Sequence, residues 1–332
     1  MKITGDIITS EKIRILGRHT EVDGCVAFDW SNSGITFTFE GTGFWLGYGE
    51  YKAPIPAYVK VFVDGIEQRF PISNGSEKTI VDTLPEGVHT ATVLKITEGV
   101  DKLLFKELTI IGSEPKLLDP PAPKSRKIEF FGDSITCGYG VLAEESVTVY
   151  NTYEQDSTKA YAFLTAGAFD AEIRSECISG QGIICNCDGK VDYEIPKFFM
   201  HSSRTKEKHD HSTWTPDVVV INAGTNDVGG GIADGIITEG AINFILSVRN
   251  QYPNAKIVWF YGMMMYGYVS AIEKAVQTVN LVDKDVYFLT CASIFNRKGE
   301  TGAVGHPNEL GQRRGADELI AKISEITGWE AK

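Results

Sequence analysis

The sequence predicts an all-β sandwich followed by an α/β domain built on a parallel sheet. Over roughly the first 110 residues, apolar and polar side chains alternate with the two-residue period of half-buried strands, as in the run that contains Ile35, Phe37 and Phe39. The later part instead alternates continuous apolar runs with helical patterns, which is typical of a parallel sheet covered by helices. A chain of 332 residues is also longer than most single domains.

Turn signals divide the first part into short strands. Gly41-Thr42-Gly43 separates two apolar runs, and Asp64-Gly65 is a strong hairpin signal because a tight primed turn requires positive φ. Short strands without a convincing helix predict a β-sandwich over residues 1–115. Prolines and charges then cluster, and proline cannot donate to a β-ladder, so we expect a linker at 116–126. The second domain is expected at 127–332.

Four apolar runs of the second domain are predicted to be strands buried on both faces: KIEFF, DVVVIN, KIVWFYG and DVYFL. Helical patterns lie between them, and the chain closes with ELGQRRGADELIAKISEI, whose apolar residues recur at helical spacing. In such a sheet, ligands bind beyond the carboxyl ends of the strands. We therefore expect the functional residues to follow these runs.

The charge balance excludes some partners. Lys and Arg total 32 against 44 Asp and Glu, which gives a net charge of −12. Nucleic acids and anionic membrane surfaces are bound through Lys and Arg, so neither is an expected partner. The N-terminal stretch lacks the apolar core of a secretory signal, so we expect a cytoplasmic location, with secretion after removal of a signal as the alternative. The sequence carries no indication of oligomeric state.

The cysteines and histidines leave one alternative open. Six cysteines are too few for a disulfide scaffold in a chain of this length. Three cysteines and three histidines do follow one another at similar spacing: Cys177, Cys185, Cys187, His201, His209 and His211. Neither group has the CxxC or HxxxH spacing usual for zinc. We favour free thiols and a polar loop, and expect no metal and no cofactor.

The predicted strand ends carry residues that suit acyl transfer. Ser134, Gly180 and Asn226 each follow such an end, and His306 precedes the last helix. A serine hydroxyl becomes a good nucleophile when a base takes its proton. The tetrahedral intermediate also needs preorganised donors for its oxyanion. The N–H groups of Ser134 and Gly180 and the side-chain amide of Asn226 can supply three donors.

Four segments resemble the sequence blocks of the SGNH hydrolases: GDSITCGYG, SGQGI, INAGTND and GHPNELGQ. With a β-rich half before it, the extended GDSITCGYG block resembles carbohydrate esterase family 2. The resemblance implies a jelly-roll domain joined to an SGNH-hydrolase domain with a flavodoxin-like parallel sheet. It also implies removal of acetyl groups from an oligosaccharide or polysaccharide. Ser134 would be the nucleophile, His306 the base, and Gly180 and Asn226 oxyanion donors.

One departure from the family pattern concerns the residue that orients His306. SGNH hydrolases usually place an Asp three residues before the His, and this chain has Ala303 there. Such an orienter holds the imidazole in the useful tautomer. Some members that resemble this chain use a backbone carbonyl instead. We therefore predict a Ser-His dyad with a carbonyl near Ala303 or Val304, and a remote carboxylate is the alternative. Asp133 is expected to hold the turn and Cys137 to pack.

Tyr139, Met265 and Trp214 are the predicted substrate-binding residues, and for each of them packing is the alternative. We expect 6-O-acetyl groups to be favoured, because a primary ester projects further from the sugar ring than a secondary one. Two other functions stay open. One is an SGNH lipase or thioesterase, and the other is a catalytically decayed sugar-binding protein.

Overall fold

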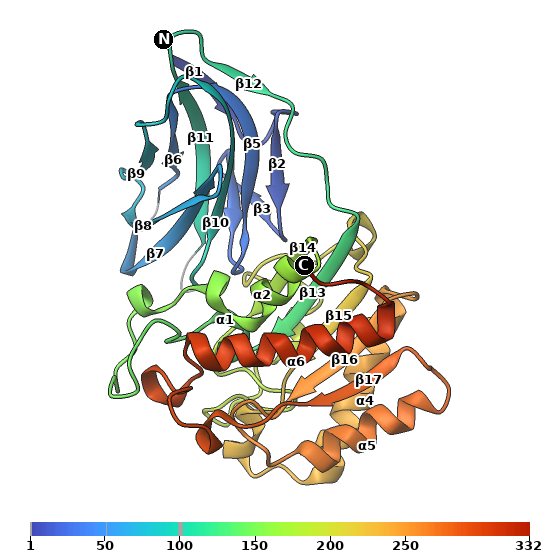
Figure 1. The fold of residues 1–332 in the computed structure, drawn as a ribbon. Coiled ribbons are helices and arrows are strands. Elements are labelled where there is room, and N and C mark those ends of the chain that lie inside the picture. The colour runs from blue at the N-terminus through green and yellow to red at the C-terminus, as the bar shows by residue number, and fades with distance from the viewer. Residues whose placement is uncertain (1, 51, 99–101) are drawn as a thin grey trace. The chain divides into compact units, whose positions relative to one another are not determined.

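The computed structural model describes residues 2–50, 52–98 and 102–332, which divide into two compact units (Figure 1). The first unit comprises the chain up to Pro123 together with Ser202–Glu207. The second comprises Lys124–His201 and Lys208–Lys332. In the described ranges, no helix combines the length and the apolar character needed to cross a bilayer.

The first unit consists of two antiparallel sheets. One has the order β3-β4-β11-β6-β9, with β1 beside β11, and the other has the order β12-β5-β10-β7-β8, with β2 beside β5. The strands are β1 Lys2–Asp6, β2 Ile13–Leu16, β3 Thr20–Val22, β4 Cys25–Phe28, β5 Ser33–Gly41, β6 Gly43–Tyr48, β7 Lys52–Val63, β8 Ile66–Asn74, β9 Lys78–Val81, β10 Gly87–Lys95, β11 Leu103–Ile111 and β12 Lys116–Leu118.

Aromatic side chains from both sheets form the core of this unit. Phe37 of β5 meets Phe44 of β6 edge to face, with ring centroids 5.0 Å apart, and Phe39 lies 5.7 Å from the same ring. Phe28 of β4 and Phe105 of β11 pack in the same way at 4.9 Å. Because β5 and β6 belong to different sheets, these contacts join the sheets through the alternate residues that the sequence placed on one face.

The predicted hairpin at Asp64-Gly65 is confirmed. Val63 of β7 pairs with Ile66 of β8, so the turn consists of the two residues between them. Asp64 and Gly65 both have positive φ, 48° and 85°. The structure also assigns the first three residues of the predicted linker to β12, which pairs with β5. Ser202–Glu207 is held to the same unit partly by Trp30 Nε1, which donates to the Ser202 carbonyl at 2.7 Å.

The second unit contains a parallel five-stranded sheet. Its order is β14-β13-β15-β16-β17, which is 2-1-3-4-5 in chain order within this unit and therefore flavodoxin-like. Strand β14 was not among the predicted apolar runs, because this edge strand carries the charged residues Glu172 and Arg174. The strands are β13 Arg126–Gly132, β14 Ala171–Cys177, β15 Val218–Asn222, β16 Lys256–Tyr261 and β17 Val286–Thr290.

Helices cover both faces of this sheet (Figure 1). Phe130 of β13 packs against Tyr161 at the start of α2, and Phe131, its neighbour on the opposite face, packs against Phe244 of α4. Residues of α6 share the cluster of Phe130. The helices are α1 Ser134–Cys137, α2 Tyr161–Ala168, α3 Ile195–Phe198, α4 Asp234–Gln251, α5 Val269–Asn280 and α6 Glu309–Thr327. The 3₁₀ turns are η1 Thr152–Glu154, η2 Ser157–Lys159, η3 His211–Thr213, η4 Asn226–Gly230, η5 Ile294–Asn296 and η6 Ala303–Gly305.

The turn from β13 into α1 is tightly packed. A Cβ added to Gly132 would lie 2.0 Å from Thr136 Oγ1 and 3.2 Å from the Asn222 carbonyl. Thr136 is fully buried and its hydroxyl is hydrogen-bonded to the Tyr161 hydroxyl at 2.9 Å, so it has little freedom to move. Glycine at 132 therefore lets α1 begin directly at the end of the strand.

Gly132→Ala is expected to destabilise the protein by about 1–3 kcal/mol, because the added methyl group overpacks the buried turn. Urea unfolding measures this change. Gly167→Ala in α2 is the matched control, since nothing lies within 4 Å of the added Cβ, and it should be neutral or stabilise by up to about 1 kcal/mol. Equal stabilities for the two variants would contradict the packing argument.

Candidate active site

Ser134 and His306 form a hydrogen-bonded pair in the second unit. Ser134 opens α1 at the carboxyl end of β13, and His306 follows η6 just before α6. The distance between His306 Nε2 and Ser134 Oγ is 2.8 Å, although 172 residues separate the two in sequence. This is the geometry in which an imidazole can take the proton of a serine hydroxyl.

The other imidazole nitrogen contacts a backbone carbonyl. His306 Nδ1 lies 3.2 Å from the Val304 oxygen, and this bond assigns the proton to Nδ1 and leaves Nε2 as acceptor. Val304 has a φ of 52°, in the left-handed region, which costs a β-branched residue about 1–3 kcal/mol. Its N–H donates to the Val147 carbonyl at 2.8 Å. The strained backbone is therefore anchored where it orients the base.

Burial sets the protonation state of the base. The desolvation of the imidazole lowers the pKa of His306 to about 4, from an ordinary value of 6.5, and the Val304 and Ala303 backbone bonds oppose this shift only in part. Lowering the pKa of a histidine means that the neutral form persists to lower pH. The imidazole is accordingly neutral, and able to accept a proton, throughout the physiological range.

Asn226 and the loop at Gly180 lie beside the nucleophile. Asn226 Nδ2 donates to Asp133 Oδ2 at 3.0 Å and to the Gln181 carbonyl at 2.8 Å. Asp133 also caps α1, since its Oδ1 accepts from the Ile135 N–H at 3.0 Å, which is the turn-holding role expected for it. Gly180 has a φ of 82°, a conformation that glycine adopts without strain. The structure thus brings Ser134, His306 and Asn226 to one site, and the Gln181 carbonyl joins the loop that carries Gly180 to Asn226.

Asp227 shapes this loop, and the sequence analysis did not single it out. Its carboxylate is fully buried and accepts from the N–H groups of Ile183, Ile184 and Cys185 at 2.8, 2.7 and 3.1 Å. Burial raises the pKa of Asp227, while the three backbone bonds oppose that rise. Its place directly after Asn226 was the available signal, because Asp after a strand often binds nearby backbone N–H groups. Asp227 fixes the loop that carries Gly180.

The three predicted substrate-binding residues lie in different places. Tyr139 packs against the imidazole of His306, with ring centroids 4.4 Å apart. Met265 follows β16 at the carboxyl edge of the sheet, and its side chain is 38% exposed. Trp214 requires a correction, because it precedes β15, at the amino edge. There Nε1 donates to Glu172 Oε2 at 3.0 Å, and the ring lies 4.4 Å from the Arg174 guanidinium. It is therefore a packing residue of the opposite edge.

Phe295 is a second aromatic residue near His306 that the sequence analysis did not identify. It lies in η5, its side chain is 53% exposed, and a Cβ added to Gly305 would be 3.7 Å from its ring. Ser293 Oγ accepts from the Phe295 N–H at 3.2 Å and fixes the turn. An exposed aromatic face thus stands one residue away from the base.

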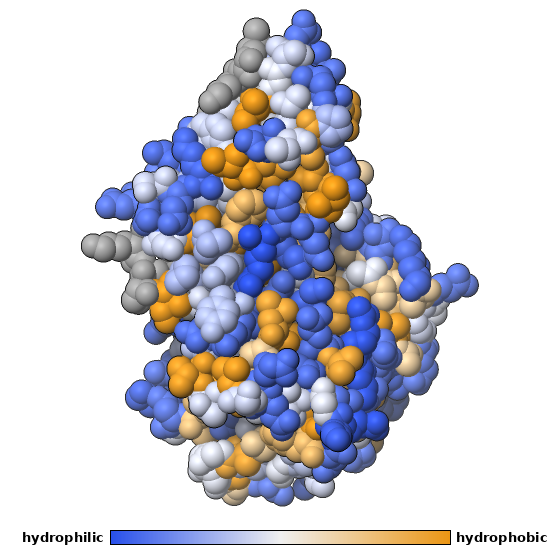
Figure 2. All heavy atoms as spheres, turned by 60° about the vertical axis from the view of Figure 1, so that its left-hand side comes forward, coloured by the Kyte–Doolittle hydropathy of each residue, from blue (hydrophilic) through white to orange (hydrophobic). Residues whose placement is uncertain are grey.

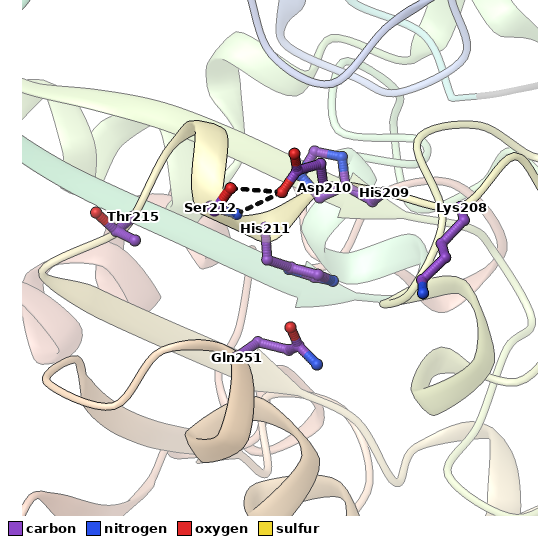
Figure 3. Close-up of a pocket in the computed structure, with 7 residues that line it drawn as sticks. All are labelled: Lys208, His209, Asp210, His211, Ser212, Thr215 and Gln251. Atoms are coloured by element: carbon purple, nitrogen blue, oxygen red, sulfur yellow. Dashed lines mark hydrogen bonds between the residues drawn. The ribbon is translucent and has the colours of Figure 1, made fainter.

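A separate pocket contains two of the histidines considered as zinc ligands (Figure 3). His209 Nε2 accepts from Arg174 Nη1 at 3.2 Å, since a guanidinium only donates, so this lone pair is engaged. His211 Nδ1 is hydrogen-bonded to the Tyr252 hydroxyl at 2.8 Å. Among the described residues, no three His, Cys, Asp or Glu side chains are grouped to hold a metal ion. The pocket is lined by Lys208, His209, Asp210, His211, Ser212, Thr215 and Gln251.

Two family models match the chain. The GDSL-like lipase/acylhydrolase family matches residues 130–314, and the carbohydrate esterase 2 N-terminal model matches residues 15–121. The cellulase/esterase CelE of Acetivibrio thermocellus is 31% identical over 90% of this chain, which spans only 38% of that longer protein. An acetylxylan esterase/glucomannan deacetylase of Cellvibrio japonicus is 28% identical over 73% of this chain and 68% of its own length.

Solved structures agree with these matches. A family two carbohydrate esterase from Clostridium thermocellum, in complex with cellohexaose, is 30% identical and has a TM-score of 0.89, covering 96% of this chain and 99% of that one. One from Cellvibrio japonicus has the same TM-score at 22% identity, covering 99% of each chain, which is a likeness of fold. The family and fold class predicted from the four sequence blocks are confirmed. The chain belongs to the GDSL-like lipase/acylhydrolase family and, within it, to the family 2 carbohydrate esterases.

Proposed function

We propose that this chain is a metal-independent serine O-acetyl esterase that removes acetyl groups, preferentially at the 6-O position, from oligosaccharides or polysaccharides. The observation that carries the proposal is the 2.8 Å contact between Ser134 Oγ and a neutral His306 Nε2. The bond from Nδ1 to the Val304 carbonyl supports a Ser-His dyad, because it gives the imidazole the tautomer that a carboxylate provides in a triad.

In the acylation step, His306 Nε2 takes the Ser134 proton while Oγ attacks the acetyl carbonyl carbon. The carbonyl oxygen becomes an oxyanion, toward which the N–H groups of Ser134 and Gly180 and the Asn226 amide are the proposed donors. The Asn226 protons already contact Asp133 and Gln181, so the amide would share one of them with the oxyanion. Collapse of the intermediate breaks the bond to the sugar oxygen, which receives the proton from His306.

In the deacylation step, a water molecule takes the place of the sugar. His306 removes a proton from this water, whose oxygen attacks the acetyl-serine carbonyl. When the second tetrahedral intermediate collapses, the bond between its carbon and Ser134 Oγ breaks and His306 gives its proton to Oγ. The product is acetic acid, which ionises to acetate in solution. Each proton that the imidazole accepts is thus given back within the same half-reaction, as general acid–base catalysis requires.

The relatives support a carbohydrate substrate. Their names describe a cellulase/esterase and an acetylxylan esterase/glucomannan deacetylase, and a structural neighbour was solved with cellohexaose. Phe295, exposed next to Gly305, supplies a flat apolar surface of the kind on which pyranose rings stack. A lipase or thioesterase needs room for a long acyl chain instead, so the rates on p-nitrophenyl acetate and on longer-chain esters separate these functions. A decayed sugar-binding protein would hydrolyse neither.

Ser134→Ala and His306→Ala are each expected to lower kcat on p-nitrophenyl acetate by about a thousandfold or more, with unchanged circular dichroism. The double variant should be no slower than the singles, because nucleophile and base act as one unit. Glu300→Gln tests for a hidden third member, since Glu300 is a carboxylate only six residues before His306 in the chain. A carboxylate whose loss matches that of His306 would overturn the dyad.

Chelation is expected to leave activity unchanged, because the proposed base is an imidazole and the proposed oxyanion donors are amides. The measurement is the rate on p-nitrophenyl acetate after dialysis against EDTA, with a zinc-dependent esterase treated in parallel as the positive control. Loss of activity that zinc restores would refute metal independence and leave the nucleophile assignment to be judged from Ser134→Ala.

Acetyl groups at the 6-O position of a manno-oligosaccharide are expected to be removed first, because a primary ester reaches the oxyanion donors with less clash between ring and pocket. Misplacement of the carbonyl by about 1 Å costs on the order of a hundredfold in rate. Proton NMR of an acetylated mixture during digestion follows each position. Acetylxylan is the matched control, since a xylopyranose ring has no 6-hydroxyl. Early loss of the 2-O or 3-O acetyl signals would contradict the 6-O preference but would still agree with the proposed esterase activity.

A further inference from the structure

Two tyrosines form a stack that ends on the catalytic imidazole. The rings of Tyr139 and Tyr150 are nearly parallel, with an interplanar angle of 16° and centroids 3.8 Å apart. On its other side Tyr139 approaches His306, with centroids 4.4 Å apart and an angle of 39°. All three side chains are half-buried, so the stack covers the imidazole from one side.

The far end of the stack is tied to the helix that carries the nucleophile. The Tyr150 hydroxyl donates to Gln155 Oε1, and Gln155 Nε2 donates to the Cys137 carbonyl, at the end of α1, at 3.0 Å. Gln155 is fully buried. The Tyr139 N–H also donates to the Ser134 carbonyl at 3.1 Å. The contacts therefore form a closed network, from Ser134 through α1, Gln155 and the two tyrosine rings to His306, whose Nε2 contacts Ser134 again.

In a Ser-His dyad, the imidazole ring must be held toward the serine without a carboxylate, and this network of contacts can do so. Neutral backbone acceptors hold the imidazole weakly, so rotation about the Cα–Cβ and Cβ–Cγ bonds can still move Nε2 away from Ser134. A carboxylate triad member restrains this rotation more strongly because it offers two oxygens and a full charge. Here the acceptors are neutral backbone carbonyls, and the Val304 oxygen lies 3.2 Å from Nδ1. A ring packed against the face of the imidazole opposes the rotation by steric contact.

We propose that Tyr139, backed by Tyr150, is a positioning residue that holds the imidazole plane of His306 toward Ser134 in place of an orienting carboxylate. The inference rests on the proposed Ser-His chemistry and reassigns Tyr139, which the sequence suggested as a substrate-binding residue. Tyr139 acts through His306, so its loss impairs the turnover of bound ester more than the binding of ester.

The same contact contributes to the burial of the base. Burial lowers the pKa of His306, and the groups that oppose the shift are the Val304 and Ala303 backbone. The imidazole contacts the Ser134 hydroxyl and the Tyr139 ring. On the neighbouring elements, Glu309 of α6 pairs with Lys159 at 3.7 Å, and Glu144 and Glu145 are exposed on the loop after α1. Removing the Tyr139 ring admits water to the imidazole, which stabilises its charged form and raises its pKa.

The kinetic test compares Tyr139→Ala with Tyr139→Phe on p-nitrophenyl acetate. Tyr139→Ala should lower kcat about tenfold, less than the roughly hundredfold cost of a 1 Å misplacement because the Val304 contact remains, with KM changed less than about twofold. Tyr139→Phe keeps the ring and should retain wild-type kcat. Tyr150→Ala, which removes only the support, should fall between them. Tyr153→Ala is the matched control, because it removes a 55% exposed tyrosine from the same segment.

A second readout is independent of ester hydrolysis. An NMR titration of ¹³C-labelled histidine in the folded protein should place the pKa of His306 near 4 in the wild type and in Tyr139→Phe, and higher in Tyr139→Ala, toward 6.5. The acid limb of kcat/KM should move upward by the same amount. This measurement stands even if the esterase assignment fails, since it needs no substrate.

Three results would overturn the inference. The first is a Tyr139→Ala variant that keeps wild-type kcat and an unchanged titration of His306. The second is a variant in which KM alone rises, which would return Tyr139 to substrate binding. The third is a Tyr139→Phe variant as impaired as Tyr139→Ala, which would assign the role to the hydroxyl. If Tyr139→Ala does not fold, Tyr150→Ala and the same titration decide the question.

Discussion

The parallel pairing of β13 with both of its neighbours is the constraint on which the site depends. Gly132, the last residue of β13, is in register with Cys177 of β14 and with Asn222 of β15. Three chain segments therefore leave the sheet at the same level. Ser134, Gly180 and Asn226 each follow within a few residues, so the sheet brings the nucleophile and the three proposed oxyanion donors to one edge. This is the switch point of a 2-1-3-4-5 sheet, where open α/β folds bind ligands.

Buried carboxylates hold the loops that leave this edge. Asp133 accepts hydrogen bonds from the start of α1 and from Asn226. Asp227 accepts three hydrogen bonds from N–H groups of the loop that follows Gly180. A carboxylate buried in this way is stabilised by the backbone donors that surround it. Both therefore organise the main chain around the nucleophile. The orientation of the base follows a different principle, because it rests on a carbonyl of the strained residue Val304.

The features that the sequence predicted well are those encoded locally. The Asp64-Gly65 turn and the long apolar strands of the second unit depend on a few neighbouring residues, and both appear as expected. Features set by distant partners were harder to predict. Strand β14 is an edge strand with polar residues, and the hydrogen bond from Trp214 to Glu172 joins two residues that lie far apart in the sequence. The sequence predicted a carbonyl near Ala303 or Val304 as the group that orients His306, with a remote carboxylate as the alternative, and the structure places the Val304 oxygen 3.2 Å from Nδ1.

A backbone orienter changes the balance between the two roles of the imidazole. A carbonyl carries only a partial charge, so it stabilises an imidazolium less than a carboxylate does, and this agrees with the lowered pKa of His306. A histidine with a lowered pKa is a weaker base toward Ser134 but a stronger acid toward the departing sugar oxygen. The first role then depends on the short Nε2–Oγ contact and on oxyanion stabilisation, which both require accurate positioning of the ring. The second role is favoured by burial itself. In this arrangement, packing orients the imidazole, a task that a charged carboxylate performs in a triad. The ring accordingly lies between the Val304 backbone and the aromatic rings of Tyr139 and Tyr150.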